Sequence, residues 1–279
     1  MLNYFSNCSY YVQLAVWVGL ALFANYGLML LSSRISLEVR RKHHEVAGFL
    51  FAVVGVFSAL VISSMLVIAV DHFNTARHAI EKEASLVGNV IRIARATSPA
   101  LSVTVSELMQ NELKALSKLE WDTENRDKNL ALETDSINKL SLVVAEFEPK
   151  TNRETNYHAA LISHSSELYQ ARRARAISAE ESIPPQVWVA TIAISFLTIF
   201  FSFLFGHEKG LFYYLMSAVL SVSIAIVLSL IYSFDTPFLG DIAVSNKSYI
   251  SIVNNMERYQ SWSEELKKQH LLAHRSQKN

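Results

Sequence analysis

The sequence predicts an all-α membrane protein with four transmembrane helices and a helical insert between the second and third spans. The 279 residues are 51% apolar and 18% charged, and the charged residues avoid four long stretches. Each stretch has about the 20 residues that a helix needs to cross a bilayer. The chain holds only 8 glycines and 5 prolines, which favours helices over turns and loops.

The four predicted spans contain neither proline nor an ionised residue. They are residues 12–31, 46–70, 187–206 and 211–232. Only residues 207–210 separate the third span from the fourth, so these two must form an antiparallel hairpin. No Lys or Arg precedes the first span, as a secretory signal requires, and we expect this helix to be retained.

The spans divide the chain into four segments. Residues 1–70 hold the N-terminal pair of transmembrane helices, 71–186 an extramembrane helical insert, 187–232 the C-terminal transmembrane hairpin and 233–279 an amphipathic tail. Helical apolar spacing continues past the second span to Ser98, which predicts a stalk helix. Three further insert helices are expected: one that begins at Pro99, one that ends near Pro149, and one from about Asn156 to Glu181. The tail is expected to hold one more helix, with Tyr249, Ile252, Met256 and Tyr259 on one face.

Small residues recur along one face of the second span. The set, called the small-residue stripe below, is Gly48, Ala52, Gly55, Ala59 and Ser63. Small residues let helices approach closely in lipid, so the pattern alone favours helix packing. The same face can also form the wall of a conduit if several such helices surround an axis. The sequence leaves both interpretations open.

The residues within the spans limit the chemistry. Because they include no Asp, Glu, Lys, Arg or His, a proton-driven carrier or pump is disfavoured, whereas a pore with an apolar constriction is compatible. We find no catalytic motif and expect no enzyme. The single cysteine, Cys8, excludes a multi-thiolate metal site, and we expect no metal and no cofactor. The neutral net charge and the lack of a basic stripe give no indication of nucleic-acid binding.

Two basic clusters give conflicting signals for sidedness. Arg34, Arg40, Arg41 and Lys42 lie between the first two spans, which favours a cytoplasmic connection and an insert on the other side. However, Arg172, Arg173 and Arg175 precede the third span, on the opposite side of the membrane. This second run has two interpretations, as an interfacial anchor and as an anion-attracting vestibule.

Several ordered motifs resemble those of the bacterial bestrophin-like membrane proteins. "HHEVAGF" matches at His43, Val46, Ala47, Gly48 and Phe49 and departs at His44 and Glu45. The other matching segments are the pair Glu120-Trp121, "IPPQVW" with Pro184, Pro185 and Trp188, "FSFLFG" at 201–206, and "DTPFLGDIAVS" with Pro237, Phe238, Gly240 and Asp241.

The resemblance implies a function. Bestrophins are homopentameric ion channels whose second span lines the pore. The resemblance therefore implies that the chain associates with itself, with a pentamer as the model, and that inorganic ions are its cargo. A further implication is a location in the lipid bilayer of a bacterial cytoplasmic (inner) membrane. It also implies a cytoplasmic insert, against the charge argument. The acidic string that holds calcium in bestrophins is missing after Asp241. The alternative is a non-conducting scaffold or sensor whose insert binds a partner.

Overall fold

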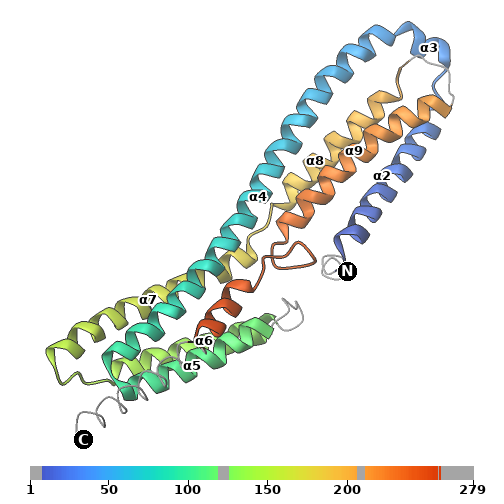
Figure 1. The fold of residues 1–279 in the computed structure, drawn as a ribbon. Helices are drawn as coiled ribbons and strands as arrows, with labels where there is room; N and C mark the ends of the chain where they lie inside the picture. Colours follow the sequence, from blue (N-terminus) through green and yellow to red (C-terminus); the bar gives the residue numbers. More distant parts are fainter. Residues whose placement is uncertain (1–7, 119–125, 206–210, 257, 259–279) are drawn as a thin grey trace, which may run out of the picture. The chain divides into compact units, whose positions relative to one another are not determined.

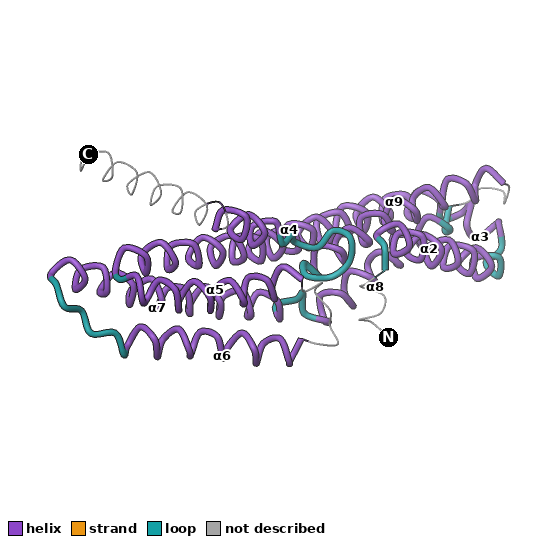
Figure 2. The backbone as a smooth tube through the Cα atoms, turned by 60° about the horizontal axis from the view of Figure 1, so that its bottom comes forward, coloured by secondary structure: helices purple, strands orange, loops and turns teal. Residues whose placement is uncertain are grey.

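The computed structural model describes residues 8–118, 126–205, 211–256 and 258, and within these ranges it contains helices and no strand (Figures 1 and 2). The predicted all-α class is therefore confirmed. The helices are α2 (Tyr10–Ser32), α3 (Leu37–Lys42), α4 (His44–Thr97), α5 (Pro99–Lys118), α6 (Arg126–Ala145), α7 (Asn152–Glu180), α8 (Pro185–Ser202) and α9 (Leu211–Asp235).

Among the described residues, four helical stretches are long and apolar enough to cross a membrane, as predicted. They are α2, the first part of α4, the stretch that ends with α8, and α9. A break at 181–184 separates α8 from α7, and Pro185 begins α8 at the first helical position, where its missing N–H costs nothing. The connection between the first two spans contains the short helix α3.

The chain forms two compact units. Unit 1 comprises residues 1–75 and 180–244, and unit 2 comprises 76–179 and 245–279. Unit 1 therefore holds α2, α3, the uncharged part of α4, α8 and α9, whereas unit 2 holds the rest of α4 with α5, α6 and most of α7.

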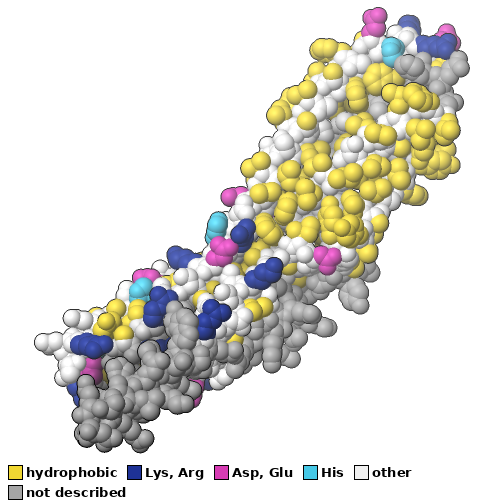
Figure 3. Space-filling view, in the orientation of Figure 1, with side chains coloured by type: hydrophobic (Ala, Val, Ile, Leu, Met, Phe, Trp, Pro, Cys, Tyr) yellow, Lys and Arg dark blue, Asp and Glu magenta, His cyan; other side chains and the backbone are white. Residues whose placement is uncertain are grey.

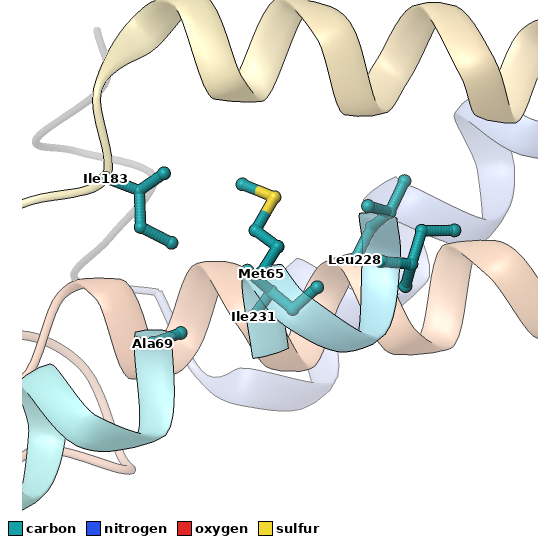
Figure 4. Packing of buried hydrophobic residues seen from close by; sticks show 6 residues of the cluster. Met65, Ala69, Ile183, Leu228 and Ile231 are labelled. Carbon is teal, nitrogen blue, oxygen red and sulfur yellow. The ribbon is translucent and has the colours of Figure 1, made fainter. Parts of the chain in front are cut away.

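In unit 1, α2 and α9 pack along each other in antiparallel fashion. Ser233 Oγ donates to Gln13 Oε1 at 3.3 Å, and Ser221 Oγ to Asn25 Oδ1 at 3.2 Å. An apolar core connects α4 and α9 to the segment before α8 (Figure 4). It consists of Ile62, Met65, Ala69, Ile183, Leu228 and Ile231. The face of unit 1 that Figure 3 shows carries mainly hydrophobic side chains, and α2, α4, α8 and α9 all have exposed large hydrophobic residues, as lipid contact requires.

In unit 2, α4 continues as the predicted stalk helix. Its apolar residues pack inside the unit, where Ala76, Ile80, Val87 and Val90 are buried. The helix ends at Thr97, and α5 begins at Pro99, as the sequence predicts. In the tail, residues 247–256 are helical, with Tyr249 and Met256 buried, whereas Tyr259 lies outside the described residues.

The start of α7 corrects a prediction. The helix begins at Asn152 and not near 156. Thr151 Oγ1 accepts from Glu154 N at 3.1 Å, while Glu154 Oε2 accepts from Lys150 N and Thr151 N at 2.6 and 3.2 Å. This reciprocal arrangement is a capping box, which satisfies amide groups at a helix start. The Thr-x-x-Glu spacing of Thr151 and Glu154 is a sequence signature of a helix start at this point.

Candidate functional site

The uncharged part of α4 has one buried side in the single chain. Its buried residues are Ala47, Ser58, Ile62, Met65 and Ala69. Thr191 Oγ1 of α8 lies 3.1 Å from Met65 Sδ in this contact. The buried side therefore holds α4 against the other helices of unit 1 and leaves its remaining faces uncovered.

The small-residue stripe lies outside this buried side. Ala52, Ala59 and Ser63 are exposed, and Gly48 and Gly55 are partly exposed. A Cβ atom added at Gly48 would lie 3.6 Å from the Phe205 ring, and one added at Gly55 would meet nothing within 4 Å. Ser63 Oγ donates to Leu60 O of its own helix at 3.0 Å. The described residues cover only the Gly48 end of the stripe, so close packing along the rest of it requires a second molecule.

Beside the stripe, α4 exposes bulky apolar side chains. They are Phe49, Val56, Leu60 and Val67, and Phe49 is 71% exposed. Successive members are seven, four and seven residues apart, so the 3.6-residue turn aligns them on one face. The second span thus presents two different uncovered faces, one small and one bulky.

At one end of unit 1, two matching motifs meet around Asp235, the last residue of α9. Asp235 Oδ1 accepts from Ile183 N at 2.8 Å, and Oδ2 accepts from Trp188 Nε1 at 3.2 Å. His72 Nδ1 lies 3.8 Å from Asp235 Oδ1, too far for a hydrogen bond but close enough for ion pairing when the imidazole is protonated. Asp235, Ile183, Trp188 and His72 are called the motif junction below.

Aromatic rings pack on Trp188 of the motif junction, and a second carboxylate, Asp241, lies in the turn that follows α9. Trp188 stacks on Trp17 at a centroid distance of 6.1 Å, and Tyr232 lies edge-on to Trp188 at 6.2 Å, an arrangement typical of a membrane interface. Asp241 Oδ2 accepts from Ser9 Oγ at 2.6 Å and from Tyr10 N at 3.2 Å. The side chain of Ser9, the N-cap residue of α2, makes no capping hydrogen bond to its own helix. Asp241, from a distant part of the chain, caps the start of α2 instead.

Two other matching motifs meet at Phe205. Its ring lies edge-on to His44 and Phe51, at centroid distances of 5.5 and 5.4 Å, and faces Gly48. "FSFLFG" therefore packs on the first turns of "HHEVAGFLF". The motifs that are far apart in the sequence pair with each other in space.

Unit 2 contains a buried ionic cluster that sequence reasoning missed. Glu83 of α4 is fully buried and accepts from Arg172 Nε at 3.0 Å, Arg175 Nε at 2.6 Å and the Tyr249 hydroxyl at 2.9 Å. Arg172 also pairs with the buried Glu112 of α5. Arg172 and Arg175 are buried in this cluster, so they form neither an interfacial anchor nor an anion-attracting vestibule, and both predicted interpretations are wrong for these two residues. Of the three arginines, Arg173 alone is exposed.

Glu83 lies beyond the uncharged part of α4, and two opposing effects set its pKa. Burial raises the pKa of this carboxyl, but the charges of Arg175 and Arg172, with hydrogen bonds from Arg175 and Tyr249, outweigh burial and hold the pKa below its ordinary value of 4.5. Glu83 is therefore ionised at neutral pH and neutralises two arginines that burial would otherwise disfavour.

Residues 18–249 match the model of the bestrophin-like domain. The chain belongs to the bestrophin-like family. Comparison with curated proteins and with solved structures gives no match. With its four apolar helices, this member of the family is a multi-pass membrane protein.

The family motifs occupy several structural roles in this bestrophin-like chain. His43 is the C-cap residue that follows α3, Ala47 is buried, and Val46 and Phe49 are exposed. Pro184 is the N-cap of α8. Around Gly240, whose φ of +75° suits glycine, the turn closes with Val244 N donating to Pro237 O at 2.7 Å, and Phe238 is buried. Glu120 and Trp121 lie outside the described residues.

The residues at the end of α9 and in the turn after it do not fit the calcium site that true bestrophins carry. Calcium takes six to eight oxygen ligands, whereas Asp235 and Asp241 are already bonded to N–H and O–H donors. In the part of the chain that the structure describes, no three His, Cys, Asp or Glu side chains gather as a metal site. Both carboxylates serve to hold helix ends together.

Proposed function

We propose that this bestrophin-like protein is a homo-oligomeric ion channel of a bacterial cytoplasmic membrane, with α4 lining the pore. The observation that carries the proposal is the small-residue stripe, which runs along the second span and is left largely uncovered by its own chain. Family membership and the uncharged spans support it further. The proposal involves no enzymatic step.

The chemistry of the stripe suits a narrow apolar pore. Small side chains leave room around an axis when several copies of α4 assemble, and the wall carries no fixed charge. Such a wall gates by wetting and dewetting of its constriction. Selectivity then depends on charges outside the span.

Reconstitution of the full-length protein into planar bilayers tests conduction. We expect unitary currents, with reversal potentials in asymmetric salt that identify the charge of the permeant ion. Silence across varied ions, pH and voltage contradicts the proposal.

Cysteine accessibility tests the pore face separately. Cys8 is the single cysteine, so Cys8→Ser gives a cysteine-free background. We expect a charged thiol reagent added from water to modify Ala52→Cys, Ala59→Cys and Ser63→Cys and to reduce the current. Val56→Cys and Leu60→Cys, on the bulky face, are the matched controls and should react slowly. Equal reactivity on both faces argues against a pore lined by the stripe.

A specific observation also supports a non-conducting scaffold or sensor. On α7, Ile162, Tyr169 and Ile177 are each about half exposed, and their spacing of seven and eight residues places them on one helix face. An apolar row of this kind can bind a partner helix. A silent, strictly monomeric protein would favour this second function over the channel.

A further inference from the structure

Arg40 is a buried cation without a partner in the described part of the chain. It lies near the end of α3 and is only 5% exposed. Its Nε and Nη1 atoms are buried, and no described group accepts a hydrogen bond from them. Tyr213 of α9 is a neighbour of Arg40, but its hydroxyl donates to Ser202 O at 2.7 Å and supplies no counter-charge.

This arrangement differs from that of the other buried arginines among the described residues, Arg172 and Arg175. Arg172 and Arg175 each pair with Glu83. A guanidinium stays charged in proteins, and a buried charge is costly unless it is paired. Among the described residues no carboxylate accepts a hydrogen bond from Nε or Nη1 of Arg40, and the acidic residues nearest in sequence, Glu38 and Glu45, are exposed. Arg40 therefore lacks the compensation that the fold provides elsewhere.

The position of Arg40 indicates what supplies the missing charge. It lies in the connection between the end of α2 at Ser32 and the start of the second uncharged span at Val46, which is the depth of the lipid headgroups. Arg41 and Lys42 follow it and are exposed, so the local potential attracts anions. The planar fork of an arginine matches the oxygens of a phosphate group.

We propose that Arg40 is the centre of a binding site for a phosphate-bearing anion, with the headgroup of an anionic lipid as the occupant that its depth favours. The small exposed part of Arg40 gives the phosphate access from the membrane interface, and the positive charges of Arg41 and Lys42 add attraction. Free phosphate shares this chemistry. The site is independent of whether the protein conducts ions.

The test compares the full-length protein in nanodiscs of phosphatidylcholine with and without phosphatidylglycerol. We expect phosphatidylglycerol to raise the unfolding temperature of the wild type. Arg40→Met, an apolar residue of similar length, should abolish this rise. In pure phosphatidylcholine the same variant should be at least as stable as the wild type, because it removes an unpaired buried charge. The order of the two stabilities therefore reverses between the two lipid compositions.

Lys42→Gln is the matched control, because it removes one positive charge from the exposed surface of the same short helix. Native mass spectrometry of detergent-solubilised protein counts bound phosphatidylglycerol directly. We expect Arg40→Met to weaken binding about tenfold or more, as the loss of a charge-assisted contact does, and Lys42→Gln to change it little. Equal losses in both variants, or none in Arg40→Met, overturn the proposal.

Two further arms complete the design. Inorganic phosphate is titrated in the absence of anionic lipid. If a free anion occupies the site, phosphate should stabilise the wild type but not Arg40→Met, and this result supports the same site with free phosphate in place of a lipid headgroup. If Arg40→Met fails to fold, Arg40→Lys keeps the charge and loses the fork, so its phosphatidylglycerol response should be weaker than that of the wild type. A wild type whose unfolding temperature is the same with and without phosphatidylglycerol, and that inorganic phosphate does not stabilise either, contradicts the site outright.

Discussion

Two glutamates of α4 in unit 2 differ strongly in how much they contribute to the stability of the fold. Glu83 is fully buried between two arginines, whereas Glu81 pairs with Arg77 at 2.9 Å on the exposed surface. Removing one member of a buried pair leaves its partner charged and unsolvated, which costs about 3–5 kcal/mol. An exposed pair is screened by water and contributes little.

We therefore expect Glu83→Gln to lower the unfolding temperature strongly and Glu81→Gln to leave it nearly unchanged. Both substitutions remove one negative charge and keep the side-chain shape. The measurement is thermal unfolding of the detergent-solubilised full chain, with hydrogen exchange over α4 and α7 to locate the loss. Similar effects of the two variants would mean that net charge, not the buried cluster, sets the difference.

The same cluster predicts a pH dependence. Since the pKa of folded Glu83 lies below the ordinary value of 4.5, the carboxylate stabilises the fold fully above that value. The contribution is lost as pH falls through the lower pKa of the folded state. The stability difference between wild type and Glu83→Gln should thus be constant near neutral pH and shrink below about pH 4.5. A difference that already changes between about pH 6 and 8 would point to a histidine instead.

At the scale of helices, α2 and α9 are joined by a row of polar contacts. Gln13 and Asn25 of α2 are buried and bond to Ser233 and Ser221 of α9. In a bilayer such interhelical hydrogen bonds contribute about 0.6 kcal/mol on average, with a maximum near 1.7. The row fixes which residues of the two helices face each other, because a slip along α9 would bury the amides against apolar side chains.

We expect Asn25→Ala to lower the thermal stability of the protein in detergent by an amount in that range. Phe23→Ala is the control, because Phe23 is 78% exposed and faces away from the contact. An Asn25→Ala variant as stable as the wild type would show that packing alone holds α2 to α9.

Hydropathy and periodicity predicted the elements well but predicted few of the contacts between them. The spans follow from the length of uncharged stretches, and the end of α4 follows from Ser98-Pro99. Glu83 was missed because a lone acid on an apolar helix face has no visible partner until α7 folds against it. Asp241 was identified by its motif, but its role as the cap of α2 joins residues 9 and 241, and no local pattern encodes such a pairing.

At the scale of the whole molecule, unit 1 leaves apolar surface uncovered on several helices. The uncovered side chains on α4 differ from those on α2 and α9, because α4 alone combines the small-residue stripe with the bulky face. Lipid covers bulky apolar side chains well. A stripe of small residues gains more from a close neighbour or an enclosed axis than from lipid, which is why self-association through α4 is part of the proposed function.

One pair of substitutions separates packing from pore lining. Ala59 lies on the stripe, and Leu60 is its neighbour on the bulky face. If the stripe surrounds a pore, Ala59→Trp should keep the oligomer and reduce or abolish the current, because the added ring fills the axis. If the stripe packs against a second copy, the same ring prevents close approach, and the oligomer mass falls. Leu60→Trp should leave both the mass and the current unchanged, since lipid accommodates an indole.

Native mass spectrometry measures the oligomer mass, and bilayer recordings measure the current. An Ala59→Trp variant with unchanged mass and current would place the stripe against lipid, contrary to the proposed pore.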